Sequence, residues 1–137
     1  MITFAQYVGP HAASPDLTAE RAHNATKLLA ACAALEDDML EDSVEFPDNP
    51  ATSSGVSGQT FGGFRPQNCP QGAPNSSHKD GLAVDRYDPK GEIDDWCIAH
   101  QDRLALHGIY IEHPSATQNW SHWTIRKPGS GNRVFFP

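Results

Sequence analysis

The stretch Ser76–Asp85, with the sequence SSHKDGLAVD, decides the fold of the central part of the chain. Gly81 allows a tight turn, because it has no Cβ to clash with the backbone. In the four residues after it, large apolar side chains alternate with small or polar ones, which is typical of a short half-buried strand. Side chains alternate between the two faces of a strand, so Ala83 and Asp85 share one face. The segment therefore predicts a strand ending at Asp85 and a turn that brings His78 back toward it.

These two residue types suggest a metal site. Histidine nitrogens and carboxylate oxygens are both zinc ligands, and a catalytic zinc ion takes three protein ligands and leaves one position to water. The segment Trp120–Trp123 (WSHW) offers the third ligand, because a strand there places Trp120 and His122 on one face. We therefore predict that His78, Asp85 and His122 hold one Zn²⁺.

The rest of the chain predicts an α+β domain. Residues 17–40 have the apolar period of a helix, and residues 93–106 have the pattern of a second main helix. Residues 108–111 and 120–125 predict an antiparallel pair of strands, to which residues 133–137 add an edge strand. We expect one domain over residues 1–137, with a small antiparallel sheet, two main helices and the zinc site on the sheet.

Several segments outside these elements have simpler interpretations. Residues 1–16 show no period and predict an irregular lead-in, while residues 127–137 form a C-terminal tail. The acidic residues between Glu36 and Asp42 predict a solvated helix face. Asp94 and Asp95 predict the start of the second helix, where carboxylates favour the positive end of the helix dipole.

Composition excludes some classes of function. The formal net charge is −7, which argues against a nucleic-acid binder and against a polybasic membrane anchor. No stretch approaches the ~20 apolar residues that cross a bilayer. The three cysteines are odd in number and have no CxxC spacing, so we expect free thiols. The first residues lack the basic and apolar regions of a secretory signal.

The motif SxHxxGxAxD followed by WxH resembles the zinc peptidases of the D-Ala-D-Ala carboxypeptidase and L-alanyl-D-glutamate endopeptidase group, the M15 type. Gly62–Pro66 (GGFRP) resembles the Gly-Tyr/Phe-Arg segment of that group, and residues 128–137 resemble the tail of small phage-encoded members. The resemblance covers residues 55–126 loosely. It implies a hedgehog/DD-peptidase-like fold and zinc-dependent hydrolysis of a peptide bond in peptidoglycan stem or cross-linking peptides. By resemblance, Arg65 binds a substrate carboxylate or the transition-state oxyanion. We also expect Ser76, Asn119 and Trp120 to contact the substrate.

The general base departs from the pattern of this group. Asn119 stands three positions before His122, where much of the group has an acidic residue, and an amide cannot take a proton from zinc-bound water. Glu112 is the nearest substitute, because it lies opposite His122 if the two strands pair in that register. A shift of one residue would send it to the other face. His113 is a further candidate, and a site without a base would bind zinc and be slow or inert.

Two classes of function follow. The first is a monomeric peptidase that acts on peptidoglycan stem peptides, as a phage endolysin would. Such an enzyme would be made in the host cytoplasm without a signal peptide and would reach the cell wall through a membrane lesion made by another protein. The second is a virion structural protein, or a wall-binding module, that keeps the fold and has degenerate catalysis. Whether an internal bond or a terminal residue is cut stays open at this level.

Overall fold

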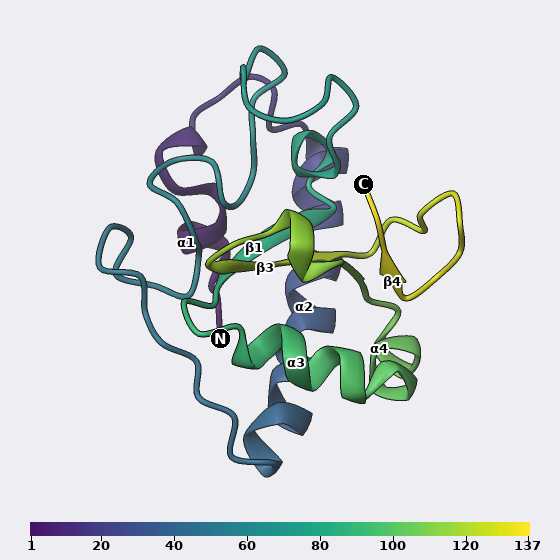
Figure 1. The fold of residues 1–137 in the computed structure, drawn as a ribbon. Coiled ribbons are helices and arrows are strands. Elements are labelled where there is room, and N and C mark those ends of the chain that lie inside the picture. Colours follow the sequence, from purple (N-terminus) through teal and green to yellow (C-terminus); the bar gives the residue numbers. More distant parts are fainter.

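The computed structural model describes all residues, 1–137, and has the α+β architecture that the sequence predicts (Figure 1). Four α-helices and four strands are joined by loops and by three short 3₁₀ turns. Along the chain they are α1 (Phe4–Val8), η1 (Gly9–His11), α2 (Ala19–Glu41), η2 (Ser77–Asp80), β1 (Ala83–Tyr87), α3 (Glu92–Ala99), α4 (Gln101–His107), β2 (Tyr110–Glu112), η3 (Pro114–Ala116), β3 (Trp120–Thr124) and β4 (Val134–Phe135). None of the helices combines the length and the apolar character that a membrane span requires.

The four strands form one sheet in the order β1-β3-β2-β4. The predicted antiparallel pairing of β2 with β3 is confirmed, and β1 is antiparallel to β3 as well. The prediction of a wholly antiparallel sheet is wrong, because β4 runs parallel to β2. The long connection from β3 returns the chain to the far edge of β2 before β4 begins, which reverses the direction expected of a hairpin.

The free edge of β1 is covered by residues 55–62. They make a single bridge, Val56 to Arg86, and no regular strand. Backbone hydrogen bonds still join the two segments: the Asp85 amide donates to the Gly62 carbonyl at 2.7 Å, and the Ser57 amide donates to the Asp85 carbonyl at 2.8 Å. The loop therefore fixes the edge of the strand that carries Asp85.

The apolar core lies between α2 and one face of the sheet. Helix α2 starts at the Thr18 cap, whose hydroxyl accepts from the Arg21 amide at 3.2 Å. Its buried stripe is Ala25, Leu28, Leu29, Cys32, Leu35 and Met39, as the apolar period predicts. Leu40, expected on the same stripe, is 57% exposed. The sheet contributes Val84, Ile111 and Trp123 to this cluster. All three cysteines are buried and unpaired, as expected.

Two sequence predictions about helices are wrong. The expected irregular lead-in contains α1, which starts at a Thr3 capping box and buries Tyr7 and Val8; five residues are too few to show a period. The expected single helix over residues 93–106 is divided into α3 and α4. The break is at His100 (φ −128°, ψ 48°), whose ring Nδ1 bonds the Trp96 carbonyl at 2.8 Å.

The acidic segment of α2 is a solvated face only in part: Asp37, Glu41 and Asp42 are exposed as predicted, whereas Glu36 and Asp38 are paired. Glu36 is 3% exposed, and its carboxylate lies 2.7 Å from the Arg86 guanidinium under the sheet. Asp38 binds Arg103 and His107 of α4, each at 2.7 Å. The hydrogen bond from Arg103 lowers the pKa of Asp38 to about 2. These carboxylates connect α2 to the sheet and to α4, which sequence patterns along one helix cannot reveal.

Candidate metal centre

Asp85 and His122 are directly opposite each other on β1 and β3. The backbone N–H and C=O of Asp85 both point away from β3, to Gly62 and Ser57, so the pair is one of the non-hydrogen-bonded positions of the ladder. Side chains at such positions approach each other most closely. His122 Nδ1 accordingly lies 2.9 Å from Asp85 Oδ1.

His78 reaches the same carboxylate oxygen from the η2 turn, with Nε2 at 3.2 Å from Asp85 Oδ1. The Ser76 hydroxyl accepts from the His78 amide at 3.3 Å and starts the turn. Gly81 ends it with φ 73°, and a Cβ there would lie 2.5 Å from the Arg21 carbonyl oxygen. The predicted glycine turn is therefore required both by its backbone angle and by its contact with α2.

The ring of His78 is oriented by a backbone carbonyl. His78 Nδ1 lies 2.8 Å from the Gly63 carbonyl oxygen, which can only accept, so Nδ1 carries the proton and the Nε2 lone pair faces Asp85. Gly63 passes so close to α1 that a Cβ would lie 1.9 Å from the Tyr7 carbonyl oxygen, and Gly62 meets the Ser57 carbonyl oxygen in the same way, at 1.7 Å. The Gly-Gly pair thus lets the loop approach closely enough to hold the histidine.

The three predicted ligands form a group that could hold a metal ion. One donor atom from each of His78, Asp85 and His122 lies within 4.8 Å of the other two. Metal–nitrogen and metal–oxygen bonds of about 2.0–2.2 Å in a tetrahedral site place ligand atoms roughly 3.3 Å apart. The two measured separations from Asp85 Oδ1, 3.2 Å and 2.9 Å, are close to that value. The donor set and the spacing therefore fit a divalent ion.

The protonation states also suit a metal. Burial lowers the pKa of His78, although Asp85 opposes this effect. Burial works to raise the pKa of Asp85, but His78 and His122 outweigh it and hold that pKa well below its usual range. A charged carboxylate and a neutral imidazole are the forms that bind metal.

Arg65 binds the other oxygen of the Asp85 carboxylate. Its Nη2 donates to Asp85 Oδ2 at 3.3 Å, its Nε donates to the Phe61 carbonyl at 2.7 Å, and its Nη1 reaches the Gln71 carbonyl at 3.5 Å. The guanidinium is 9% exposed. Arg65 therefore orients Asp85, and the loop carbonyls orient Arg65.

A hollow of about 460 Å³ opens beside the three ligands, and we call it the inner hollow. Four of the predicted site residues also line it, namely Arg65, Ser76, Glu112 and Trp120. Asn119 does not line it: its side chain is exposed, its φ is 74°, and its carbonyl accepts from the Asp88 amide at 3.0 Å. His113 lies outside it too, with its ring stacked on Phe136 at 4.5 Å.

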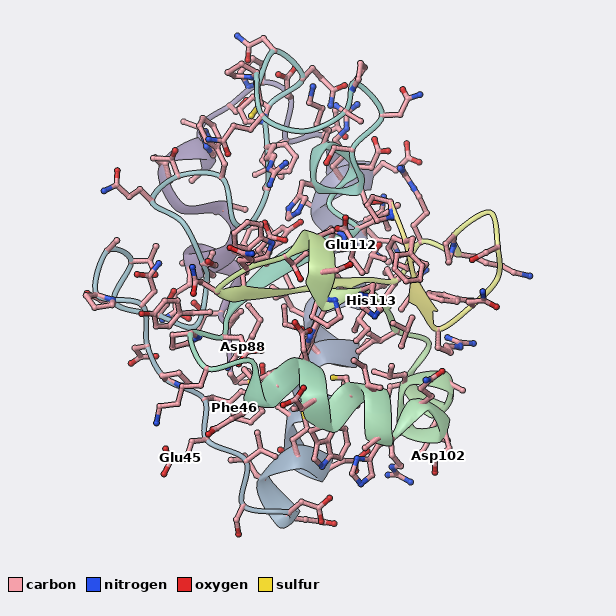
Figure 2. All side chains as sticks on the ribbon, viewed as in Figure 1. Glu45, Phe46, Asp88, Asp102, Glu112 and His113 are labelled. Atoms are coloured by element: carbon pink, nitrogen blue, oxygen red, sulfur yellow. The ribbon has the colours of Figure 1, made fainter.

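The register of β2 on β3 agrees with the predicted position of Glu112 beside His122. The β2–β3 pairing runs Tyr110 to Thr124 and Ile111 to Trp123, so the next position places Glu112 opposite His122. Figure 2 shows Glu112 on the side of the sheet away from α3, and Asp88 on the α3 side. Burial raises the pKa of Glu112, while His122 opposes the rise.

Sequence reasoning missed four contributors to the site. The Gly63 carbonyl leaves no side-chain signal, and Gln71 lies in a loop without a period. Phe135 and Pro137 reach the inner hollow from β4 and the residues after it, and Phe135 meets the His122 ring edge-on at 6.3 Å. The aromatic pair Phe135–Phe136, inside the predicted edge strand of residues 133–137, was the one available signal for this wall.

Comparison with known proteins gives no independent assignment. No family model, no curated protein and no solved structure matches this chain.

Proposed function

We propose that this protein is a zinc-dependent peptidase that hydrolyses a peptide bond of peptidoglycan. One observation carries the proposal: two histidines and an aspartate converge beside a hollow that also holds a carboxylate. Three nitrogen and oxygen ligands with one side open to solvent are typical of catalytic zinc, whereas a structural zinc site is closed by a fourth protein ligand.

Glu112 is the general base in this proposal. A zinc ion at such a site acidifies a water toward a pKa of about 7 and polarises a carbonyl group. Glu112 accepts the proton of the attacking water and returns it to the leaving amine, so that the carbonyl carbon gains a hydroxyl group and the nitrogen gains a hydrogen. Burial raises the pKa of Glu112, which is the direction that favours a group that must both take and return a proton.

Arg65 positions the aspartate ligand and contributes positive charge where the oxyanion develops. Its hydrogen bond to Asp85 Oδ2 leaves Oδ1 for the metal. The guanidinium has five N–H groups, three of which bind Asp85, Phe61 and Gln71, and Arg65 lines the hollow. Preorganised donors of this kind stabilise charge in a transition state.

The wall peptide as substrate is supported by the sequence motifs. The segments SxHxxGxAxD, WxH and GGFRP together supply the three candidate ligands and also Arg65, Ser76 and Trp120, and they are the features that resemble peptidoglycan peptidases. A role as a phage endolysin is the corresponding biological proposal.

A second function is favoured by Asn119. If Glu112 does not act as a base, the same metal centre would belong to a virion protein or to a module that binds wall peptides without cutting them. Metal binding is common to both functions, so only turnover separates them.

The deciding experiment combines metal analysis with digestion of purified peptidoglycan fragments. We expect about one zinc ion per chain and new amino groups in the digest. The Glu112→Gln variant should keep its zinc and lose roughly 10²–10⁴-fold in kcat, the usual contribution of a general base. His113→Gln is the matched control, one residue away and outside the hollow, and it should retain activity. Zinc without any release of amines would favour the binding function, and unchanged turnover in Glu112→Gln would exclude Glu112.

A further inference from the structure

The free edge of β1 has a side chain among its hydrogen-bond partners. The backbone groups of Asp85 face away from β3, and those of Ala83 do the same, because backbone groups alternate along an antiparallel strand. The Ala83 carbonyl accepts from the hydroxyl of Tyr7, in α1, at 2.9 Å. Gly62 and Ser57 bind the next backbone groups along this edge. The phenol of Tyr7 is therefore the first of the contacts that hold the edge of the strand carrying Asp85.

The backbone of the same tyrosine holds the loop that orients His78. The Tyr7 carbonyl accepts from the Phe64 amide at 3.1 Å. Gly63, the residue before Phe64, places its own carbonyl 2.8 Å from His78 Nδ1. Tyr7 therefore connects two supports of the metal centre: the strand that carries Asp85 and the segment that orients the His78 ring.

The phenol of Tyr7 is suited to a fixed connection. The residue is 2% exposed and packs in the apolar core. Burial raises the pKa of the Tyr7 hydroxyl well above its usual range, so the hydroxyl keeps its proton and remains a donor. The capping box of Thr3 and Gln6 fixes the start of α1, the helix from which Tyr7 projects. The separation between β1 and the Gly63 segment is thus set by a rigid, permanently protonated group.

We propose that Tyr7 is a positioning residue of the metal centre, which fixes the distance between Asp85 and the His78 ring by joining β1 to the Gly63–Phe64 segment. The proposal rests on the zinc site of the proposed function and not on the bond that is cut. Without the hydroxyl, the buried Ala83 carbonyl loses its partner. The strand and the loop are then no longer held together, and the metal has to order its own ligands, which lowers its affinity.

Tyr7→Phe tests this role, because it removes the hydroxyl and keeps the ring in the core. We expect zinc affinity, measured by competition with a chelating dye, to fall about 10–100-fold, the usual cost of losing a partner that orients a ligand. In the zinc-loaded protein, the NMR signal of the His78 Nδ1–H proton should shift, because its hydrogen bond to Gly63 changes.

Ile109→Val is the matched control. It removes one buried methyl group from the same core, directly before β2, which β3 separates from β1. Zinc affinity and the His78 signal should stay nearly as they are. Unfolding in urea with a chelator present measures the stability of both variants without a contribution from metal. If Tyr7→Phe loses stability but keeps the zinc affinity and the His78 signal of the parent protein, the tyrosine only packs the core and the proposal is overturned.

A second variant tests the same connection from the loop. Gly63→Ala keeps the phenol, but its Cβ would lie 1.9 Å from the Tyr7 carbonyl oxygen, so the loop has to move away from α1. We expect zinc affinity to fall by a factor similar to that of Tyr7→Phe. An unchanged affinity would overturn the proposal, because the position of this segment would then not fix the His78 ring.

The proposal and the peptidase function can fail separately. A parent protein that binds zinc and cuts no wall fragment would contradict the peptidase, while the affinities of the Tyr7 and Gly63 variants would still decide the role of Tyr7. A parent protein that binds no zinc would overturn both.

Discussion

Two neighbouring pairs of residues on β1 and β3 show how one backbone serves two purposes. Val84 is opposite Trp123, and Asp85, one position further, is opposite His122. The first pair is fully buried and belongs to the apolar cluster against α2. The second pair faces the inner hollow and forms two thirds of the candidate metal centre. The two pairs lie on opposite faces of the sheet because successive side chains alternate along a strand.

Both pairs take equivalent positions on the sheet, and they differ in the contacts that hold them. The core pair is held by apolar contact, which is non-directional. The ligand pair buries a carboxylate that is 7% exposed, which is unfavourable unless the charge is paired. His78, His122 and Arg65 supply the pairing. Substitutions on the core face should therefore change stability first, and those on the face of the inner hollow should change metal affinity first.

The largest effect is expected from Trp123→Ala. The indole is fully buried, and its Nε1 donates to the Ser121 hydroxyl at 2.8 Å. Its removal leaves a cavity, and we expect the free energy of unfolding to fall by about 3–5 kcal/mol. Unfolding in urea with a chelator present measures this without a contribution from metal. A loss under about 1 kcal/mol would show that the indole is not part of the core.

For His122→Ala we expect the reverse, a large loss of zinc affinity with little change in stability. Loss of the partners that merely orient a ligand costs about 10–100-fold in metal affinity, so loss of the ligand should cost more than ~100-fold. The metal-free protein should unfold with nearly the same free energy, because His122 lies outside the apolar cluster and Asp85 keeps His78 and Arg65 as partners. Competition with a chelating dye measures the affinity.

His113→Ala provides the control for that variant. The ring of His113 is outside the inner hollow and stacks on Phe136, so its loss should leave zinc affinity unchanged. Equal losses in the two variants would mean that His122 affects the metal only through folding.

The ligand set was predictable because each part has a local signal. Alternation along β1 places Asp85, the Gly81 turn places His78, and alternation along β3 places His122. Their meeting requires one long-range fact, the register of β1 on β3, and the structure provides it. The predicted position of Glu112 depended on a second register, that of β2 on β3. The pairs Tyr110–Thr124 and Ile111–Trp123 agree with that prediction.

The parts that escaped prediction depend on contacts between distant segments. The break at His100 and the burial of Glu36 depend on tertiary contacts, which a short window of sequence does not reveal. Asn119 was expected in the site because of its spacing from His122, yet its positive φ turns it away. Spacing fixes which face a residue takes only inside a regular strand, and Asn119 precedes the start of β3.

The smallest effect concerns Asp94, which lies on the core face behind His122. Its side chain is 2% exposed and accepts from the Ser121 hydroxyl at 2.5 Å. Burial raises the pKa of Asp94 to about 7, against an ordinary value near 4 in the unfolded chain. Between these values the folded protein holds a proton that the unfolded chain has released. The stability contributed by this proton is therefore complete below about pH 4 and is lost as the pH rises through about 7.

The expected slope is at most about 1.4 kcal/mol of unfolding free energy per pH unit between pH 5 and pH 6, downward as the pH rises. Asp94→Asn keeps an acceptor for Ser121 and removes the titration, so it should flatten the slope and make the variant more stable than the parent protein above pH 7. Urea unfolding with a chelator, repeated across this range, gives the slope. Asp95→Asn is the matched control: Asp95 is the exposed neighbour of Asp94 on α3, and its charge is a lesser cause of the raised pKa of Asp94 than burial, so the slope should stay nearly as it is. A slope that disappears in both variants, or in neither, would show that the buried carboxyl on the core face is not the group that titrates.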